Sequence, residues 1–113
     1  MKTPLACLAF TAALLPACAS ARRSEPIAGP IPLDAKAAAG QVVFMRNCHV
    51  CHPRGEAGVG PALNNKPLPD AAIEVQIRTG VVGAGTMPPF PPEVLRDQEI
   101  DQIIAYLTAL RKI

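Results

Sequence analysis

The chain has 113 residues, a formal net charge of +2, four cysteines, one tyrosine and no tryptophan. This length favours a single domain. The balanced charge, the lack of a basic run and the lack of an aromatic platform exclude a typical nucleic-acid-binding protein.

The N-terminus is typical of a secretory signal. Lys2 provides a short positive start, and Leu5 to Leu15 form an apolar run that is too short to span a bilayer and is followed by small residues. We therefore expect residues 1–19 to be a signal peptide and the mature protein to be periplasmic.

Two cleavage patterns remain open at the end of this signal. Leu15-Pro16-Ala17-Cys18 resembles a bacterial lipobox, in which the cysteine is lipidated and becomes the first mature residue. Ala17-Cys18-Ala19 and Ala19-Ser20-Ala21 instead resemble ordinary small-x-small cleavage sites. Residues 20–33 are polar and proline-rich, which predicts a flexible linker. A linker after Cys18 favours a lipoprotein attached to a membrane, and the other pattern predicts a soluble periplasmic protein.

The remaining domain, residues 34–113, is small and poor in aromatic residues, with only Phe44, Phe90 and Tyr106. A chain of this size rarely builds a sufficient hydrophobic core unaided and usually needs an additional staple. The composition therefore fits a fold that is built around a cofactor.

The first helix is predicted over residues 35–46, with Asp34 as its N-cap. Ala37, Gly40 and Phe44 fall on one face of this helix. Glycine costs about 1 kcal/mol relative to alanine in a helix interior. Close approach of another backbone or ring at Gly40 would account for this cost.

The pentapeptide Cys48-His49-Val50-Cys51-His52 follows this helix and carries the chemistry. Two cysteines three residues apart, with a histidine directly after the second, are typical of a c-type haem attachment site. Three residues are about one helical turn, so both sulfurs face the same porphyrin edge. We predict that Cys48 and Cys51 tether one haem c covalently and that His52 is the proximal axial ligand.

Two other interpretations of this motif are less favoured. A redox dithiol needs a preceding strand, but the stretch before Cys48 has a helical pattern. A structural zinc site needs four ligands from two separated pairs, and no cysteine or histidine after residue 33 lies outside the pentapeptide. His49 occupies a variable position of the motif and is expected to be a surface residue that points away from the iron.

Two loops and two helices follow the motif. Residues 53–69 are rich in glycine and proline and predict a loop. The second helix is predicted over 71–79, with Asp70 as its cap and Gly80 at its end. After a second loop, over 81–92, the last helix is predicted over 98–112, with Asp97 as its N-cap. This pattern predicts an all-α fold with three main helices, whose long loops are explained if a cofactor lies between them.

Met87 is the favoured candidate for a sixth iron ligand. Met45 lies on the helix that leads into the attachment site, so it cannot easily reach the other face of a haem. Met87 lies 35 residues beyond His52 in a loop that proline and glycine stiffen. A single methionine usually fills space in a core, but a proline-flanked loop position is poorly suited to that role, which favours ligation.

The chain resembles the class I (mitochondrial-type) cytochrome c family in its bacterial mono-haem form. Four pieces match in order between about residues 40 and 110: Gly40-x-x-x-Phe44-x-x-x-Cys48-x-x-Cys51-His52, Gly60-Pro61-x-Leu63, Thr86-Met87-Pro88-Pro89-Phe90 and Ile103-Ile104-Ala105-Tyr106-Leu107.

The resemblance implies a small cytochrome c-like fold wrapped around one haem with His52 and Met87 as axial ligands. It also implies a hydrogen bond from His52 Nδ1–H to the Pro61 carbonyl oxygen, and packing of Gly40 and Phe44 against Ile103 and Tyr106. Arg78 and Gly80 resemble the family too, but the role of Arg78 does not follow from the sequence.

Two functions follow from these residues. The first is an electron carrier, not an enzyme, because two strong axial ligands leave no open site for a substrate. Its partners would be redox proteins, namely a dehydrogenase, an oxidase or a respiratory complex. The alternative is a haem enzyme or gas-binding sensor, which requires that Met87 is absent from the iron or easily displaced.

Overall fold

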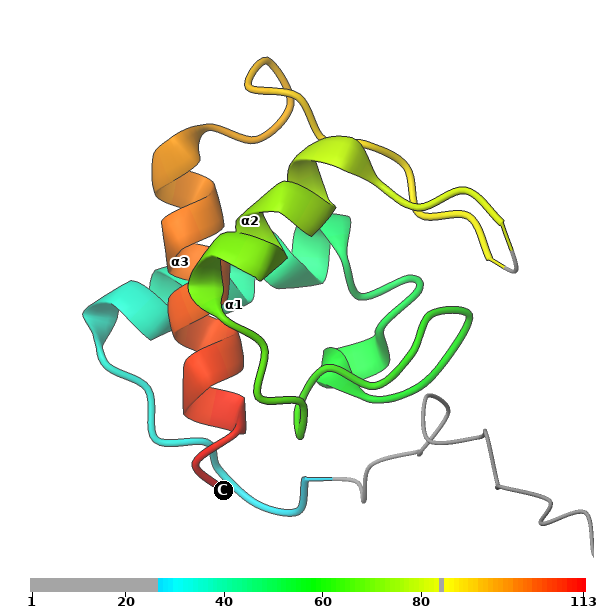
Figure 1. Cartoon of the computed structure of the whole chain (residues 1–113). Coiled ribbons are helices and arrows are strands. Elements are labelled where there is room, and N and C mark those ends of the chain that lie inside the picture. Colours follow the sequence, from blue (N-terminus) through cyan, green and yellow to red (C-terminus); the bar gives the residue numbers. More distant parts are fainter. Residues whose placement is uncertain (1–26, 84) are drawn as a thin grey trace, which may run out of the picture.

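The computed structural model describes residues 27–83 and 85–113. This part of the chain contains α1 (Ala35–Asn47), the short 3-10 turn η1 (Pro53–Gly55), α2 (Asp70–Thr79) and α3 (Asp97–Leu110), joined by long loops (Figure 1). The described residues form no strand, only an isolated antiparallel bridge between Val81 and Met87. The predicted all-α fold with three main helices is confirmed.

The first and last helices cross at Gly40 and form the centre of the domain (Figure 1). A Cβ atom on Gly40 would lie 1.8 Å from the backbone oxygen of Gln102 and 3.1 Å from the backbone nitrogen of Ile103. The rings of Phe44 and Tyr106 are fully buried beside this point, with centroids 5.2 Å apart and a tilt of 57°. The glycine therefore allows α3 to approach the backbone of α1, which explains its presence in a helix interior.

A hydrophobic core surrounds this crossing and includes one face of α2. Its most deeply buried large side chains are Phe44, Leu95, Ile100, Ile103 and Tyr106. Ile73 and Ile77, one turn apart on α2, join the same cluster. The apolar faces expected from the spacing of these residues are thus the faces that pack together.

The helix starts differ from the prediction at two of three positions. Asp34 caps α1 as expected, because its carboxylate accepts a hydrogen bond of 2.8 Å from Ala37 N–H. Asp70 and Asp97 are instead the first residues of α2 and α3, and neither is the N-cap. The N-cap and the first helical position both suit aspartate, because the N-terminus of a helix carries a partial positive charge. The sequence pattern therefore does not separate these two positions.

The segment before α1 contacts the domain more than a flexible linker would. Residues 27–33 have no helix or strand, but Ile27, Ile31 and Leu33 are partly buried and pack against the core. This part of the predicted linker is therefore held on the domain surface.

The predicted signal peptide, the lipobox cysteine Cys18 and residues 20–26 lie outside the described residues. Among the helices of 27–83 and 85–113, none is long and apolar enough to cross a bilayer.

Candidate functional site

The pentapeptide motif continues from the end of α1 as a tight turn. Cys48 N–H donates to Phe44 O (2.7 Å), and the Cys48 oxygen then accepts from the N–H groups of Cys51 (3.2 Å) and His52 (2.9 Å). These bonds keep both cysteines within one turn of backbone at the end of a packed helix. Both thiols are free and partly buried. The local geometry therefore presents two sulfurs from one rigid element.

The His52 ring is buried, with only 7% of the residue exposed, and one of its nitrogens is engaged. Nδ1 lies 2.8 Å from the carbonyl oxygen of Pro61, which is the contact that the family resemblance implies. Because a carbonyl oxygen only accepts, Nδ1 must carry the proton in the neutral ring. Nε2 is then unprotonated and can act as a ligand.

Gly60 is required beside this ring. A Cβ atom at that position would lie 2.3 Å from Cε1 and 2.7 Å from Nδ1 of His52. In addition, Gly60 N–H donates to Cys51 O (2.8 Å), which ties the loop back to the motif. The Gly60-Pro61 pair thus supplies both the space for the His52 ring and the acceptor that orients it.

The Cys48 thiol differs from the reactive thiol of a redox dithiol. Burial, with a smaller contribution from the nearby Cys51, raises the pKa of the Cys48 thiol to about 12. Catalytic C-x-x-C pairs have a thiol whose pKa is lowered below the usual 8.5, so the raised value argues against thiol–disulfide exchange. The described residues contain no group of three or more His, Cys, Asp or Glu side chains that could hold a metal ion.

His49 has a structural contact that its sequence position did not reveal. The residue is only partly buried, and its Nδ1 accepts a hydrogen bond of 3.1 Å from Arg54 N–H. Arg54 adopts a positive φ of 55°, which is uncommon for a residue other than glycine. His49 therefore supports the η1 turn.

The loop that carries Met87 is folded back on itself. Val81 and Met87 exchange two backbone hydrogen bonds, of 2.9 and 3.0 Å. Gly80 begins this loop with φ 69°, and a Cβ atom there would lie 2.3 Å from Met87 O. Met87 itself is partly buried and packs against the core. The loop is thus built tightly around the end of α2, and Gly80 allows its return.

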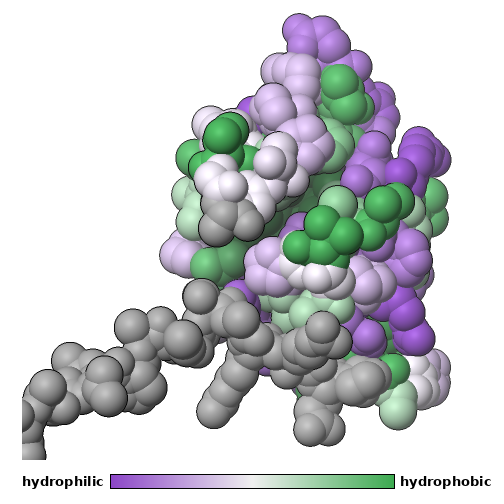
Figure 2. All heavy atoms as spheres, turned by 90° about the vertical axis from the view of Figure 1, so that its right-hand side faces the viewer, coloured by the Kyte–Doolittle hydropathy of each residue, from purple (hydrophilic) through white to green (hydrophobic). Residues whose placement is uncertain are grey.

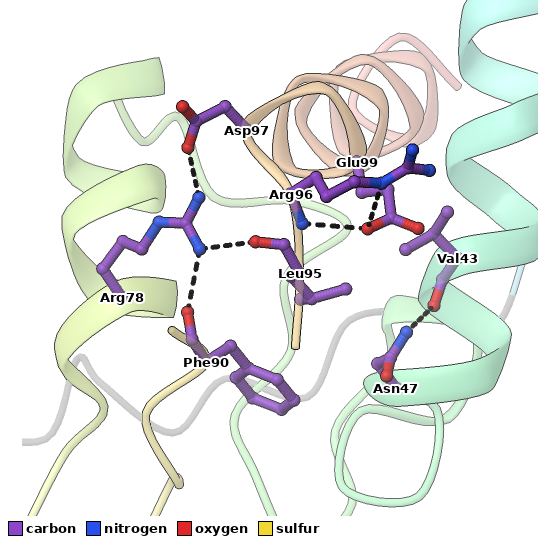
Figure 3. Close-up of polar contacts among 8 residues, drawn as sticks. All are labelled: Val43, Asn47, Arg78, Phe90, Leu95, Arg96, Asp97 and Glu99. Carbon is purple, nitrogen blue, oxygen red and sulfur yellow. Dashed lines mark hydrogen bonds and ion pairs between the residues drawn. The ribbon is translucent and has the colours of Figure 1, made fainter. Parts of the chain in front are cut away.

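Arg78 closes the far end of the same loop (Figure 3). Its Nη1 donates to Phe90 O (3.0 Å) and Leu95 O (2.6 Å), and its Nη2 forms an ion pair with Asp97. The sequence marked Arg78 only through a resemblance, because its three partners lie 12 to 19 residues away.

The loop after η1 (green) and the loop after α2 (yellow) reach out on the same side of the molecule in Figure 1. Figure 2 shows this side as a face with a groove between two protruding parts, with hydrophobic residues on its floor and its rims. Exposed valines in the two loops, Val59, Val81 and Val82, add to the hydrophobic character of this side. The arrangement is suited to a large, flat and mainly apolar group.

A second depression, of about 620 Å³, lies between the starts of α1 and α2 and the end of α3. It is open, is lined by charged residues such as Asp34 and Glu74, and includes none of the motif residues. We therefore place the functional site at the hydrophobic groove.

Comparisons with known proteins agree with this geometry. Residues 35–107 match the protein family described as "Cytochrome C oxidase, cbb3-type, subunit III". The chain is also 34% identical over 83 residues to the 4-cresol dehydrogenase [hydroxylating] cytochrome c subunit of Pseudomonas putida, which covers 74% of this chain and 70% of the relative. No solved structure matches significantly. With the pentapeptide, the crossed terminal helices and the His52–Pro61 contact, these matches show that the chain belongs to the class I cytochrome c family.

Proposed function

We propose that this protein is a periplasmic electron carrier that holds one haem c, with Cys48 and Cys51 as the covalent tethers and His52 and Met87 as the axial ligands. The observation that carries the proposal is the buried His52 ring, whose Nδ1 is held 2.8 Å from Pro61 O directly after the cysteine turn. This arrangement is typical of a histidine prepared for metal ligation, because the outer partner sets the tautomer and raises the basicity of the other nitrogen.

The residues at the groove fit a haem. The thiols of Cys48 and Cys51 come from one turn, and the Nε2 of His52 is available. Met87 is itself partly buried, in a loop whose prolines stiffen it. When bound, a haem with a His/Met pair supplies a single-electron couple with a raised potential. The work of the protein is to orient the His52 ring through Pro61 and to hold the Met87 thioether near the groove. The apolar walls of the groove keep water away from the site.

The proposed partner is a dehydrogenase. The relative from Pseudomonas putida is named as the cytochrome c subunit of one, and the site residues of this chain suit electron transfer better than substrate chemistry. We propose that the substrate is oxidised on the partner and that this chain accepts the electrons singly. Co-purification from the native host tests this proposal: a dehydrogenase subunit is expected, whereas recovery with a terminal oxidase alone would contradict it.

Attachment to a membrane through Cys18 is a separate proposal, based on Leu15-Pro16-Ala17-Cys18 and the proline-rich segment that follows. Mass spectrometry of the mature N-terminus tests it. A diacylglyceryl-modified Cys18 is expected, and a free amine at Ser20 or at a later residue would show a soluble periplasmic protein instead.

Covalent haem attachment is tested by replacing both cysteines. The double variant Cys48→Ser/Cys51→Ser should carry no covalent haem, and each single variant should retain less than the wild type. Denaturing electrophoresis with haem staining measures this directly. Covalent haem in the double variant would contradict the proposed attachment.

Axial ligation is tested by comparing two methionines. Met87→Ala should lower the reduction potential, because a thioether stabilises ferrous over ferric iron. It should also abolish the far-red methionine–iron absorption band and permit carbon monoxide binding, because the sixth ligand is lost. Met45→Leu is the matched control, because Met45 lies on α1 and is 37% exposed, so it should change none of these properties. A high-spin wild type that binds carbon monoxide readily would instead support a haem enzyme or gas sensor.

A further inference from the structure

Arg78 makes three polar contacts through its guanidinium group. Its side chain projects from the last turn of α2 and is only 18% exposed. It donates hydrogen bonds to two backbone carbonyl oxygens, those of Phe90 and Leu95, and forms an ion pair with Asp97 (Figure 3). One planar guanidinium thus bridges α2, the loop after it and the first residue of α3.

These contacts hold the exit of the Met87 loop. Phe90 is three residues beyond Met87, and its carbonyl oxygen accepts from Arg78 while its N–H donates to Ile77 O (2.9 Å). At the entry of the loop, Val81 and Met87 are paired by two backbone hydrogen bonds. Met87 is therefore held directly at the loop entry by Val81, and the loop exit three residues later is held by Ile77 and Arg78.

The two carbonyl contacts matter more than the ion pair. The Asp97 side chain is 86% exposed, and an exposed ion pair contributes little because water and salt screen it. The carbonyl oxygens of Phe90 and Leu95 lie at a partly buried contact, where a hydrogen bond from a charged donor is stronger than a neutral one. A lysine could not replace this pattern, because its single ammonium lacks the planar fork of donors.

We propose that Arg78 is a positioning residue for the sixth ligand: by fixing Phe90 against α2 and α3, it makes Met87 resist displacement from the iron. This inference rests on the proposed ligation by Met87. It predicts that loss of the Arg78 fork loosens the segment 81–90 and lets external ligands compete with the thioether, while the attachment through Cys48, Cys51 and His52 stays intact.

The test uses the ferric holoprotein and imidazole as the competing ligand. Arg78→Gln should raise the affinity for imidazole on the order of tenfold, equivalent to about 1.4 kcal/mol, measured by loss of the far-red methionine–iron band. Arg78→Lys should show a smaller increase and guards against misfolding of the first variant. In parallel, hydrogen–deuterium exchange should become faster in residues 81–90.

Two control variants separate the Arg78 contacts from the effects of charge: Arg96→Gln makes the same change in charge elsewhere, and Asp97→Asn neutralises only the ion-pair partner. Arg96 pairs with Glu99 and is 73% exposed, so Arg96→Gln removes a guanidinium without touching the Met87 loop. Asp97→Asn removes only the exposed partner of Arg78. Both should leave the imidazole affinity within about twofold of the wild type, because surface ion pairs contribute little.

The outcomes separate this inference from the proposed function. If the wild type shows the methionine–iron band and both Arg78 variants match Arg96→Gln in affinity and exchange, Arg78 has no positioning role although the ligation stands. If the wild type lacks the band, the proposed ligation fails. In that case, unchanged hydrogen–deuterium exchange over residues 81–90 in Arg78→Gln also rejects the positioning role of Arg78. Faster exchange there supports the part of the proposal in which Arg78 holds this loop.

Discussion

Replacing Gly40 by alanine should destabilise the protein, although alanine is the better helix former. The propensity term alone favours alanine by about 1 kcal/mol. Against it, the new Cβ would lie 1.8 Å from Gln102 O and 2.4 Å from Gln102 C, inside ordinary van der Waals contact. Overpacking a tight contact costs about 1–3 kcal/mol and occasionally more. The upper end applies here, because the obstructing atoms are backbone and cannot rotate away.

Relief of this clash requires α3 to withdraw, which also loosens the contact between Phe44 and Tyr106. We therefore expect a net loss of about 2 kcal/mol, which corresponds to a fall in Tm of roughly 8–16 °C for a domain of this size. Thermal unfolding of the holoprotein, followed by the far-UV circular dichroism of its helices, measures the change.

A matched control lies two residues earlier on the same helix. Ala38 is exposed, so Ala38→Gly should cost about 1 kcal/mol through propensity alone. The two substitutions run in opposite chemical directions, yet both should destabilise. A Gly40→Ala variant that is as stable as the wild type, or more stable, would refute the idea that helix contact selects glycine at this position.

Three further predictions concern His52, Tyr106 and Glu99. Gly60→Ala should displace the His52 ring and lower the free energy of unfolding by about 1–3 kcal/mol, and the variant should retain less haem in a haem-staining assay. Gly85→Ala is the neutral control, because nothing lies within 4 Å of the Cβ position at Gly85. The Tyr106 hydroxyl is buried and meets hydrogen-bond geometry with no side chain. Tyr106→Phe should therefore stabilise the protein by about 1 kcal/mol at pH 7 in chemical denaturation, and a clear loss of stability would reveal a partner. Burial raises the pKa of Tyr106, so the wild type should also lose stability as the pH rises above about 10, where the unfolded phenol ionises, and the variant should not. The pKa of Glu99 is lowered mainly by the hydrogen bond from Arg96 N–H and then by the Arg96 side chain. The capping contribution of Glu99 should therefore be present above about pH 4 and be lost as the pH falls through the lowered pKa. Glu99→Gln should remove this acid dependence in a pH series of unfolding curves, and an unchanged loss of stability in acid would contradict the prediction.

The sequence alone determined the features that depend on neighbouring residues. The three helices follow from local periodicity, and their observed bounds differ from the predicted ones by two residues or fewer. The pentapeptide identified the candidate haem site because its chemistry requires a fixed spacing of one turn. Gly40 signalled a close helix contact, since a costly residue in a helix interior needs a compensating reason.

Local patterns failed where two positions are chemically equivalent over a short range. Asp70 and Asp97 are favourable both as N-caps and as first helical residues, and only the backbone conformation separates these choices. For Asp97 the tertiary partner adds a reason, because its carboxylate pairs with Arg78. His49 is similar: its bond to Arg54 N–H depends on the path of the η1 turn, which the motif does not specify.

Only the tertiary structure decided how distant segments converge on the groove. Arg78 reaches carbonyl groups 12 and 17 residues away, and no residue-type pattern marks a backbone carbonyl as a partner. The contact between Gly60 and the His52 ring likewise depends on the loop returning across the motif. Such contacts are invisible in the sequence because every residue carries the same carbonyl group, and the fold alone determines which carbonyl lies within reach of a given donor.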